Sequence, residues 1–528
     1  MRPRNLKAST VKPSLAGRLV LSAAYPVARF RGSGSPYGTK GKRVVQPVDV
    51  ESPERARKGC ATTEHACPGP LPTAALAELR ADLARLGRPR LGGRVAVCSG
   101  TLIRAQGLLG RVGIGDAVRI ERGIAAASAR TPPFDRSRSI LAEVVGFDPD
   151  GVRLMPYEEP VGIGYRARVA LEPDLPTIAP DARWLGRVID ALASPLDGRG
   201  PLPTGPRSYP IQARALDAQH RSLLGPRLRL GVRALDLFVP CRAGQRLGIF
   251  AGSGVGKSTL LAMIARGTTA DALVIALVGE RGRELNELLE HTLGAEGRAR
   301  STVVVATSDQ PAMMRRRAAY LAVTVAEALR DRGLSVLLLI DSVTRFAAAL
   351  REIYLAAGEP PTTKGYPPGV FGELPRLLER AGPGSGAGSI TALVSVLVEG
   401  DDMNDPIADT VRGILDGHVV LDRKIAEAGR FPAIDVLKSV SRVAPGCYEP
   451  AERAVVARAR ALLARWAEMA ELVQLGAYRA GSDPELDEAI RVRPALEALL
   501  AQAPDDAPAG EDPFAALARI LGTAGSSD

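Results

Sequence analysis

Short apolar runs alternate with helical stretches in the second half of the chain. The runs are RLGIFA (246–251), ALVIALVG (272–279), TVVVAT (302–307), VLLLID (336–341) and ITALVSVLV (390–398). Nearly continuous apolar runs are typical of strands that are buried on both faces, and helices connect such strands in parallel order. The pattern therefore predicts an α/β domain over 171–445, with helices on both faces of a parallel sheet. Residues 171–240 contain many Pro and Gly and are expected to be a loop-rich connection.

The segment before this domain has a different pattern of apolar residues. Its apolar runs are shorter and separated by turn residues: RVAVC (94–98), AVRIE (117–121), ILAEVVGF (140–147), GVRLM (151–155) and ARVAL (167–171). Such spacing predicts a small all-β barrel or sandwich over 89–170. After about residue 445 the pattern becomes helical, which predicts a C-terminal helical domain over 446–528.

The N-terminal part has no sustained period. Residues 1–70 are rich in Pro, Gly, Ser, Arg and Lys and are predicted to be a disordered basic extension. An amphipathic helix is predicted over 71–88, because the leucines of TAALAELRADLARLG (73–87) fall on one helical face. This helix either packs on its own domain or binds a partner, and the sequence favours neither.

Charge and composition exclude some classes of protein. The net charge of +11 at first suggests nucleic-acid binding. Residues 1–70, however, hold 13 Lys and Arg against 4 Asp and Glu, a surplus of 9, so only 2 of the 11 charges remain for the rest of the chain. We therefore expect no nucleic-acid partner. No apolar run approaches the roughly 18 residues of a membrane span, so membrane contact is expected only through partners. The five scattered cysteines are typical of a reducing cytoplasm.

The stretch AGSGVGKS (251–258) joins an apolar run to the helical stretch STLLAMIAR. Strand, glycine-rich loop and helix form the context in which this motif binds phosphates. Glycines let backbone N–H groups surround a phosphate, and the start of a helix favours an anion. In such a site Lys257 binds the β- and γ-phosphates, and the Ser258 hydroxyl binds Mg²⁺. The predicted nucleotide-binding residues are Gly252, Ser253, Gly254, Val255, Gly256, Lys257, Ser258 and Thr259.

Two carboxylates end apolar runs. Asp341 closes VLLLID and is predicted to hold Mg²⁺ through its water shell. Glu280 follows ALVIALVG, where an acidic group can serve as the base or orient water near the γ-phosphate. Glu284, four residues later, can be explained as a solvated charge on a helix.

Between residues 245 and 445 the chain contains, in this order, GSGVGKST, VGERGRE, LLLIDSVTRFA, GEPPTTKGYPPGVFGELPRLLERAG, GSIT and PAIDVLKSVSR. The set resembles the catalytic subunits of rotary and secretion ATPases, and PAIDVLKSVS (432–441) is its most specific member. The resemblance implies a P-loop (RecA-like) parallel-sheet core with an N-terminal β-barrel domain and a C-terminal helical domain. It also implies an ATPase that uses Mg²⁺.

The resemblance implies roles for single residues. Glu280 corresponds to the glutamate that polarises the attacking water, with Arg281 beside it, and Arg345 to an arginine near the phosphates. Phe431 stands where the family places an aromatic ring against adenine. Arg442 corresponds to the arginine finger that reaches the γ-phosphate of a neighbouring subunit. The implied catalytic residues are therefore Glu280, Lys257, Arg442 and Arg281.

A chain that carries both the glutamate and the finger completes each site only with a second copy. Such head-to-tail contacts close into a ring, and the family's ring has six subunits, so the resemblance implies a homohexamer.

PIADTVRGILDGH (406–418) and LGAYRAGSDPELDEAI (475–490) are similar to the ATPases of type III protein export, and the chain is identified as a member of the flagellar branch. The resemblance implies several partners: a dimeric ATPase regulator bound by the 71–88 helix, export-gate and stalk proteins, and export chaperones with their cargo. It implies a cytoplasmic protein that docks on the inner face of the membrane.

Three alternatives remain. An injectisome ATPase would share the same catalytic core. A rotary ATP synthase subunit is disfavoured by PIADTVRGILDGH. A hexameric RNA motor is disfavoured by the nearly neutral body and the few aromatic residues at 93–170.

Overall fold

The computed structural model describes residues 92–123, 138–173, 176–287, 293–398, 400, 402–504, 506 and 512–522. The basic extension predicted for 1–70 and the helix predicted for 71–88 lie outside these residues. Among the helices of the described segments, none combines the length and apolar character that crossing a membrane requires.

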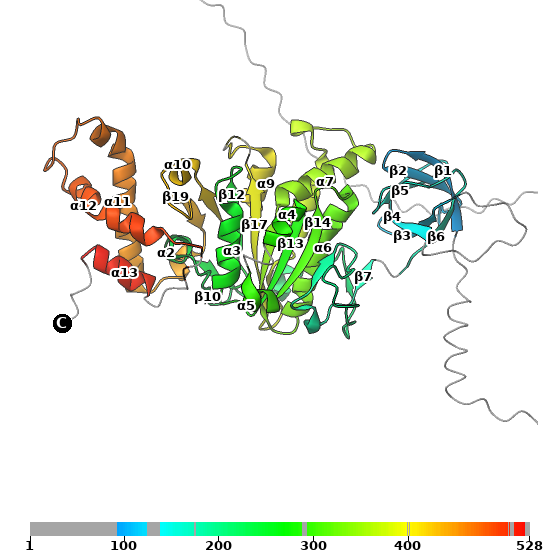
Figure 1. Cartoon of the computed structure of the whole chain (residues 1–528), viewed down its shortest axis with the longest axis horizontal. Helices are drawn as coiled ribbons and strands as arrows, with labels where there is room; N and C mark the ends of the chain where they lie inside the picture. The colour runs from blue at the N-terminus through cyan, green and yellow to red at the C-terminus, as the bar shows by residue number, and fades with distance from the viewer. Residues whose placement is uncertain are drawn as a thin grey trace, which may run out of the picture. The chain divides into compact units, whose positions relative to one another are not determined.

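In the described part of 92–171, six strands close into a barrel in the order β1-β2-β5-β4-β3-β6 (Figure 1). Their bounds are β1 Gly92–Ser99, β2 Leu102–Gln106, β3 Ala117–Glu121, β4 Ser139–Asp148, β5 Gly151–Pro156 and β6 Arg168–Leu171. Alternate side chains fill the interior, as Val118 and Ile120 of β3 do. The barrel, rather than a sandwich, is confirmed. The sequence did not predict β2, since only Ile103 and Ala105 of that strand face inward and they make too short a signal.

Nine strands form the central sheet within described residues 188–441. Eight of them run β19-β18-β12-β17-β15-β13-β14-β8, and β16 (Gly382–Pro383) pairs with β17. The bounds are β19 Ile434–Ser441, β18 Gly417–Leu421, β12 Arg246–Ala251, β17 Ser389–Leu397, β15 Ser335–Asp341, β13 Ala272–Glu280, β14 Ser301–Thr307 and β8 Val188–Asp190. Neighbours from β18 to β8 pair in parallel, and β19 pairs antiparallel at the edge.

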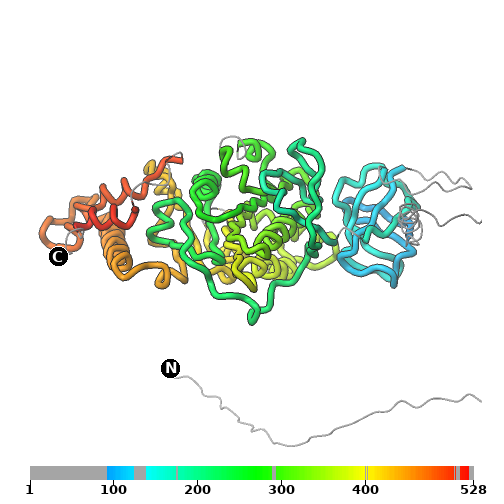
Figure 2. Tube along the Cα trace, turned by 90° about the horizontal axis from the view of Figure 1, so that it is seen from below, coloured from blue at the N-terminus to red at the C-terminus, as the bar shows by residue number. Residues whose placement is uncertain are grey.

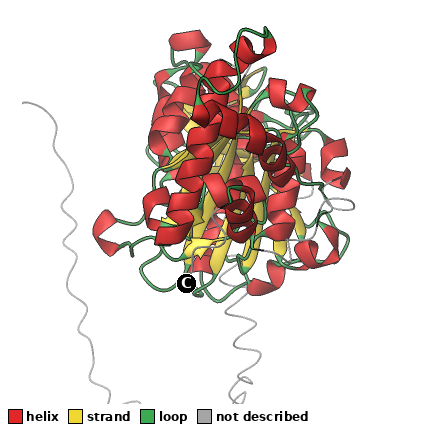
Figure 3. Ribbon diagram, turned by 90° about the vertical axis from the view of Figure 1, so that its left-hand side faces the viewer, coloured by secondary structure: helices red, strands yellow, loops and turns green. Residues whose placement is uncertain are grey.

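Helices cover both faces of this sheet (Figure 3), and β13 shows why its sequence is apolar throughout. Ala272, Val274, Ala276 and Val278 belong to the core shared with α6 (Ala312–Arg330), α7 (Val343–Ala356) and α8 (Pro368–Leu378). The intervening Leu273, Ile275 and Leu277 belong to the core shared with α2 (Arg233–Phe238) and α3 (Lys257–Gly267). Successive side chains of a strand point to opposite faces, so both sets must be apolar. The predicted parallel sheet is confirmed.

Two edges of the sheet were not predicted. β8 lies in the stretch expected to be loop-rich and pairs with β14 through only three residues, too few for a periodic signal. β18 and β19 alternate buried and partly exposed positions, unlike the continuous apolar runs of the centre.

After the sheet, α11 (Pro450–Gln474), α12 (Pro484–Leu500) and α13 (Pro513–Ile520) pack side by side (Figure 2). Ala459, Ala489 and Phe514 place one residue of each helix in the core that also contains α3. The predicted C-terminal helical segment is confirmed.

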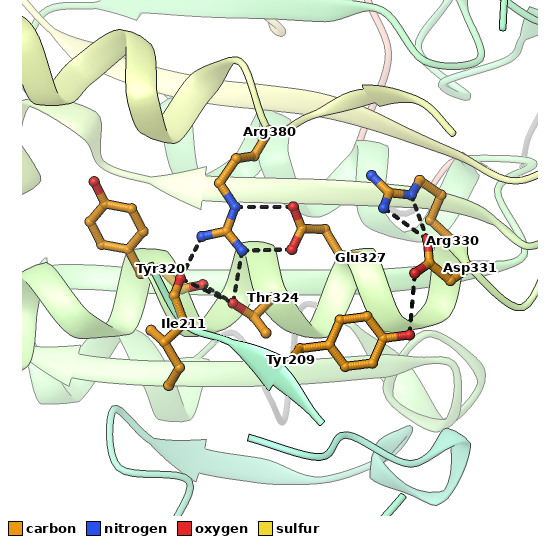
Figure 4. A network of polar contacts seen from close by, with 8 residues as sticks. All are labelled: Tyr209, Ile211, Tyr320, Thr324, Glu327, Arg330, Asp331 and Arg380. Carbon is orange, nitrogen blue, oxygen red and sulfur yellow. Dashed lines mark hydrogen bonds and ion pairs between the residues drawn. The ribbon is translucent and has the colours of Figure 1, made fainter. Parts of the chain in front are cut away.

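A buried ion pair lies on the α6 side of the sheet (Figure 4). Arg380, which follows α8, donates to both carboxylate oxygens of Glu327 on α6, at 3.0 and 2.6 Å. It also donates to Thr324 Oγ1 at 3.0 Å and to the backbone carbonyl of Ile211 at 2.5 Å. The Arg380 side chain has no exposed surface. The pair therefore joins three segments that lie far apart in the sequence.

Candidate functional site

The glycine-rich loop between β12 and α3 has a backbone suited to an anion. Gly254 and Gly256 adopt left-handed φ angles of +79° and +95°, a region open to glycine at low cost. Val255 between them is buried and fixes the loop to the core. The helix α3 begins at Lys257, directly after the loop, so its first N–H groups face the space above the loop.

Three charged side chains meet above this loop. Lys257 Nζ forms an ion pair with Asp341 Oδ1 at the end of β15 and lies 3.5 Å from Glu280 Oε1 at the end of β13. Ser395 of β17, the strand between β12 and β15, donates to the same Asp341 oxygen at 2.6 Å. The parallel strands bring these residues together, because their carboxyl ends lie at one edge of the sheet.

Glu280 is the electrostatically unusual member of this group. Its side chain is 8% exposed, and Oε1 accepts no hydrogen bond from the described residues. The pKa of Glu280 is raised to about 7: burial is the main cause, Lys257 opposes it, and the nearby Asp341 and Glu284 carboxylates add to it. A carboxyl group with this pKa can hold or release a proton near neutral pH, which suits a general base.

A cavity of about 920 Å³ opens above the loop, and most of the predicted residues line it. These are Gly252, Ser253, Gly254, Gly256, Lys257, Ser258, Thr259, Glu280, Arg281 and Arg345. Asp341 adjoins the cavity through Lys257. Glu284 also lines it, so the explanation as a solvated helix charge was incomplete.

Several lining residues were not singled out from the sequence. They are Thr344, Arg351, Lys364, Tyr366, Asp405 and Arg423. Lys364 pairs with Asp405 at 3.2 Å, and the Arg351 guanidinium lies 5.3 Å from the centre of the Tyr366 ring. Lys364 and Tyr366 belong to the motif GEPPTTKGYPPG, which is part of the family resemblance. The sequence thus marked this segment, but it did not indicate that these residues line the nucleotide cavity.

Phe431 lies against the phosphate loop. A Cβ placed on Gly256 would be 3.6 Å from Phe431 Cδ1. The ring is 47% exposed, which leaves surface for stacking on a base. Arg423, at the start of α10 (Arg423–Glu427), donates to the Ser253 carbonyl at 3.1 Å.

Arg442 does not line this cavity. It lies at the end of β19 in a separate cavity of about 300 Å³, with Asp409, Arg412, Gly413, Gly417, His418 and Val440. Its backbone N–H donates to the Asp416 carbonyl at 2.9 Å. The guanidinium is exposed and makes no hydrogen bond or ion pair with the residues that the structure describes. It is therefore available to a molecule outside its own chain.

Two oxygen-bearing side chains beside the phosphate loop fit Mg²⁺ bound together with a nucleoside triphosphate. The Ser258 hydroxyl and the Asp341 carboxylate are hard oxygen ligands, which this ion prefers. Within the described segments no cluster of three His, Cys, Asp or Glu side chains could hold a metal by itself. In many nucleotide sites the phosphates and water complete the coordination of Mg²⁺.

The raised pKa of Glu280 predicts a pH-dependent loss of stability. The unfolded chain releases this proton near the ordinary value of 4.5, whereas the folded protein holds it until about pH 7. The contribution of Glu280 to folding is thus fully present below pH 4.5, falls as the pH rises towards 7 and is absent above it. Glutamine keeps the shape and does not titrate, so Glu280→Gln is expected to gain stability relative to wild type between pH 5 and pH 7.5.

Urea unfolding of the nucleotide-free protein at both pH values measures this difference. Glu287→Gln is the matched control: its side chain is 58% exposed, so its stability relative to wild type should not change between the two pH values. Equal unfolding curves for wild type and Glu280→Gln at both pH values would contradict the prediction.

Comparisons with known proteins cover both the sheet and the C-terminal helices. The ATP synthase alpha/beta family, nucleotide-binding domain, matches residues 231–441. The T3SS EscN ATPase C-terminal domain matches residues 448–519.

Two of the relatives and one solved structure match over nearly their whole length. A flagellum-specific ATP synthase of Caulobacter vibrioides is 51% identical over 449 residues, which cover 84% of this chain and 98% of that protein. A type 3 secretion system ATPase of Xanthomonas euvesicatoria is 46% identical over 445 residues, 84% of this chain and 97% of that protein. The structure of the assembled ATPase EscN from the enteropathogenic E. coli type III secretion system has a TM-score of 0.74 at 41% identity. It covers 81% of this chain and 100% of that chain.

Proposed function

The chain belongs to the family of flagellar and type III secretion ATPases, and from this premise we propose that it hydrolyses Mg-ATP at the interfaces of a homohexamer. One observation carries the proposal. The phosphate loop and Glu280 share one cavity, whereas Arg442 lies exposed in another. A site that needs both is complete only when two copies meet head to tail, and such contacts generate rings.

Each residue has a part in the proposed reaction. Lys257 exchanges its carboxylate partners for the β- and γ-phosphate oxygens, while backbone N–H groups of 252–259 surround the phosphates. Ser258 would bind Mg²⁺ directly and Asp341 would hold it through its water shell, and the bound ion would neutralise phosphate charge. Glu280 orients the attacking water and accepts its proton. Arg442 of one copy stabilises the charge that develops on the γ-phosphate bound by the next.

The remaining site residues support this geometry. Arg345 and Arg281 line the same cavity, where their charges attract the triphosphate. Phe431 stacks on the adenine ring, since it lies beside Gly256 with part of its ring exposed.

We place the chain in flagellar protein export, where hydrolysis drives chaperone release and loading of cargo. The full-length match to a flagellum-specific relative at 51% identity, against 46% for a secretion ATPase, supports this placement. An injectisome ATPase is the second candidate, because the EscN structure is also similar over its whole chain. Loss of the chain would stop filament assembly in the first case and effector secretion in the second.

The proposed partners follow the same reasoning. EscN has also been solved in complex with its central stalk EscO, which supports a stalk partner here. A regulator dimer, export-gate proteins, chaperones and cargo complete the proposal, with a cytoplasmic location at the membrane face. Nucleic acid is not among the proposed partners.

Mixing two inactive variants tests the shared site. Glu280→Gln and Arg442→Ala are each expected to be nearly inactive, because each removes one half of every site. In a mixture assembled at random from equal amounts, about one quarter of the interfaces join an intact Glu280 to an intact Arg442. ATPase activity of the mixture should therefore recover to about a quarter of the wild-type rate.

The subunits are mixed at a dilution at which wild-type activity per chain falls, and are then concentrated. Two preparations of Glu280→Gln mixed with each other provide the control and should stay inactive. A mixture no more active than its components would contradict the shared site. So would wild-type activity that does not depend on protein concentration.

A further inference from the structure

The turn that carries Phe431 forms an ion pair and a hydrogen bond with the C-terminal end of α12 and the residues that follow it. It lies between α10 and β19 and places the ring beside Gly256 of the phosphate loop. Glu497, near the end of α12, forms an ion pair with Arg430 Nε at 2.9 Å. The backbone N–H of Gln502, two residues beyond α12, donates to the Phe431 carbonyl at 2.8 Å. Two consecutive residues of the turn thus depend on the end of one helix.

Gln502 is itself fixed to the sheet domain. Its side chain is buried, with Nε2 donating to the Gly231 carbonyl and Oε1 accepting from the Arg233 backbone N–H, both at 3.0 Å. Arg266, in the last turn of α3, donates to the Pro504 carbonyl. The 501–504 segment therefore bonds to α2, to the phosphate-loop helix α3 and to the Phe431 turn.

The ion pair at Arg430 is partly shielded from water. The Arg430 side chain is only 11% exposed, and burial lowers the pKa of its guanidinium. Its Nη2 donates to the Ile434 carbonyl at 2.9 Å, and its Nη1 has no hydrogen bond among the described residues. Without Glu497 this cation would lie in a poorly solvated place with only the weaker attraction of Asp435, which already pairs with Lys438, and the turn would rearrange to expose it.

We propose that Glu497 and Gln502 are positioning residues of the nucleotide site, which set its affinity by holding the Phe431 ring over the phosphate loop. The inference rests on the proposed function, because it assumes that Phe431 stacks on the nucleotide base. The end of α12 would then contact the turn that binds the nucleotide base. By thermodynamic reciprocity, a base stacked on Phe431 also stabilises the docked position of α12.

Phe431 is expected to contact only the base, and the phosphate loop only the phosphates. Ligands with and without a base therefore test the two parts of the site separately. ADP engages both the phosphate loop and Phe431, whereas inorganic pyrophosphate engages only the loop. Glu497→Gln and Gln502→Ala are each expected to raise the Kd for ADP roughly five- to fiftyfold. The Kd for pyrophosphate should stay within about twofold of wild type, since the loop itself is untouched.

Glu488→Gln is the matched control. Glu488 lies on the same helix and pairs with Arg458 of α11, away from the Phe431 turn. The variant removes a helix-surface ion pair of the same chemistry and should bind both ligands as wild type does. Isothermal titration with full-length protein in Mg²⁺ gives the Kd values of all variants, and the kcat of Glu488→Gln at saturating ATP should stay within about twofold of wild type.

A double-variant cycle distinguishes positioning from a general loosening of the fold. In a Phe431→Ala background the ring is absent, so Glu497→Gln should change the Kd for ADP by less than about twofold. An undiminished effect in that background would overturn the proposal. So would variants that weaken ADP and pyrophosphate equally, or that leave ADP binding unchanged. If wild type binds ADP but does not hydrolyse ATP, the proposed function fails, while the binding result still decides this inference.

Discussion

Replacing Arg442 by alanine is expected to lower kcat for ATP about 10³- to 10⁵-fold, the usual effect of removing an arginine finger. The guanidinium is exposed and has no hydrogen bond or ion pair within the described part of its own chain, so its loss should cost the fold little. It lies outside the phosphate-loop cavity, so the Kd for ADP of an isolated subunit should not change. A large loss of rate without a loss of stability or subunit affinity is the signature of a group that acts on a neighbour.

Two further variants sharpen this test. Arg442→Lys keeps the charge but not the forked donor geometry, so it should recover only a small part of the rate. Arg412→Ala removes an arginine from the same cavity whose guanidinium already bonds Asp409 at 2.7 Å, and it should retain most activity. Steady-state ATPase assays at saturating ATP, with thermal unfolding of each variant, provide the measurements. Normal turnover by Arg442→Ala would contradict the assignment.

The sequence predicted the parts of the site that one continuous stretch specifies. The phosphate loop follows a buried strand and starts a helix, and the loop residues themselves all lie within 251–259. Asp341 and Glu280 end apolar runs, and the parallel order of those runs requires their ends to share an edge. The structure places both carboxylates on Lys257. Local pattern and sheet topology were sufficient for this much.

Residues that reach the site from irregular segments could not be predicted in the same way. Lys364 and Tyr366 come from a connection between helices, and Arg423 reaches back 170 positions to the Ser253 carbonyl. No period or spacing in the sequence encodes such contacts, because they depend on how separate elements pack. The contacts of Gln502 with Phe431 and Gly231 belong to the same class.

The buried ion pair of Glu327 and Arg380 could not be predicted from the sequence either. Glutamate side chains are rarely buried unless they are paired, and Glu327 on α6 is buried against Arg380. The partner follows α8, 53 residues later, within a motif that the family resemblance singled out without giving a reason. The structure supplies a physical reason for an arginine there: a guanidinium with four acceptor contacts holds α6, the α8 end and the Ile211 segment together (Figure 4).

Removing one partner of this pair is therefore expected to destabilise the core strongly. Glu327→Gln preserves size but leaves Arg380 as a buried charge without a counter-ion, which typically costs about 3–5 kcal/mol of folding free energy. Glu327→Leu combined with Arg380→Met removes both charges and should lose clearly less than the single variant, since uncharged side chains avoid the desolvation cost. The double variant still loses the bonds to Ile211 and Thr324, so full recovery is not expected.

Arg207→Gln is the matched control in the same region. Arg207 is 69% exposed and pairs with Asp331 at 3.2 Å, while Asp331 keeps Arg330 at 2.8 Å (Figure 4). Water can replace the lost guanidinium, so the expected loss is at most about 1 kcal/mol. Urea unfolding followed by the fluorescence of the buried Trp184, in a Trp466→Phe background, reports on the sheet domain alone. A Glu327→Gln midpoint equal to that of Arg207→Gln would show that the buried pair does not hold the core, because a buried charge left unpaired cannot cost as little as the loss of an exposed one.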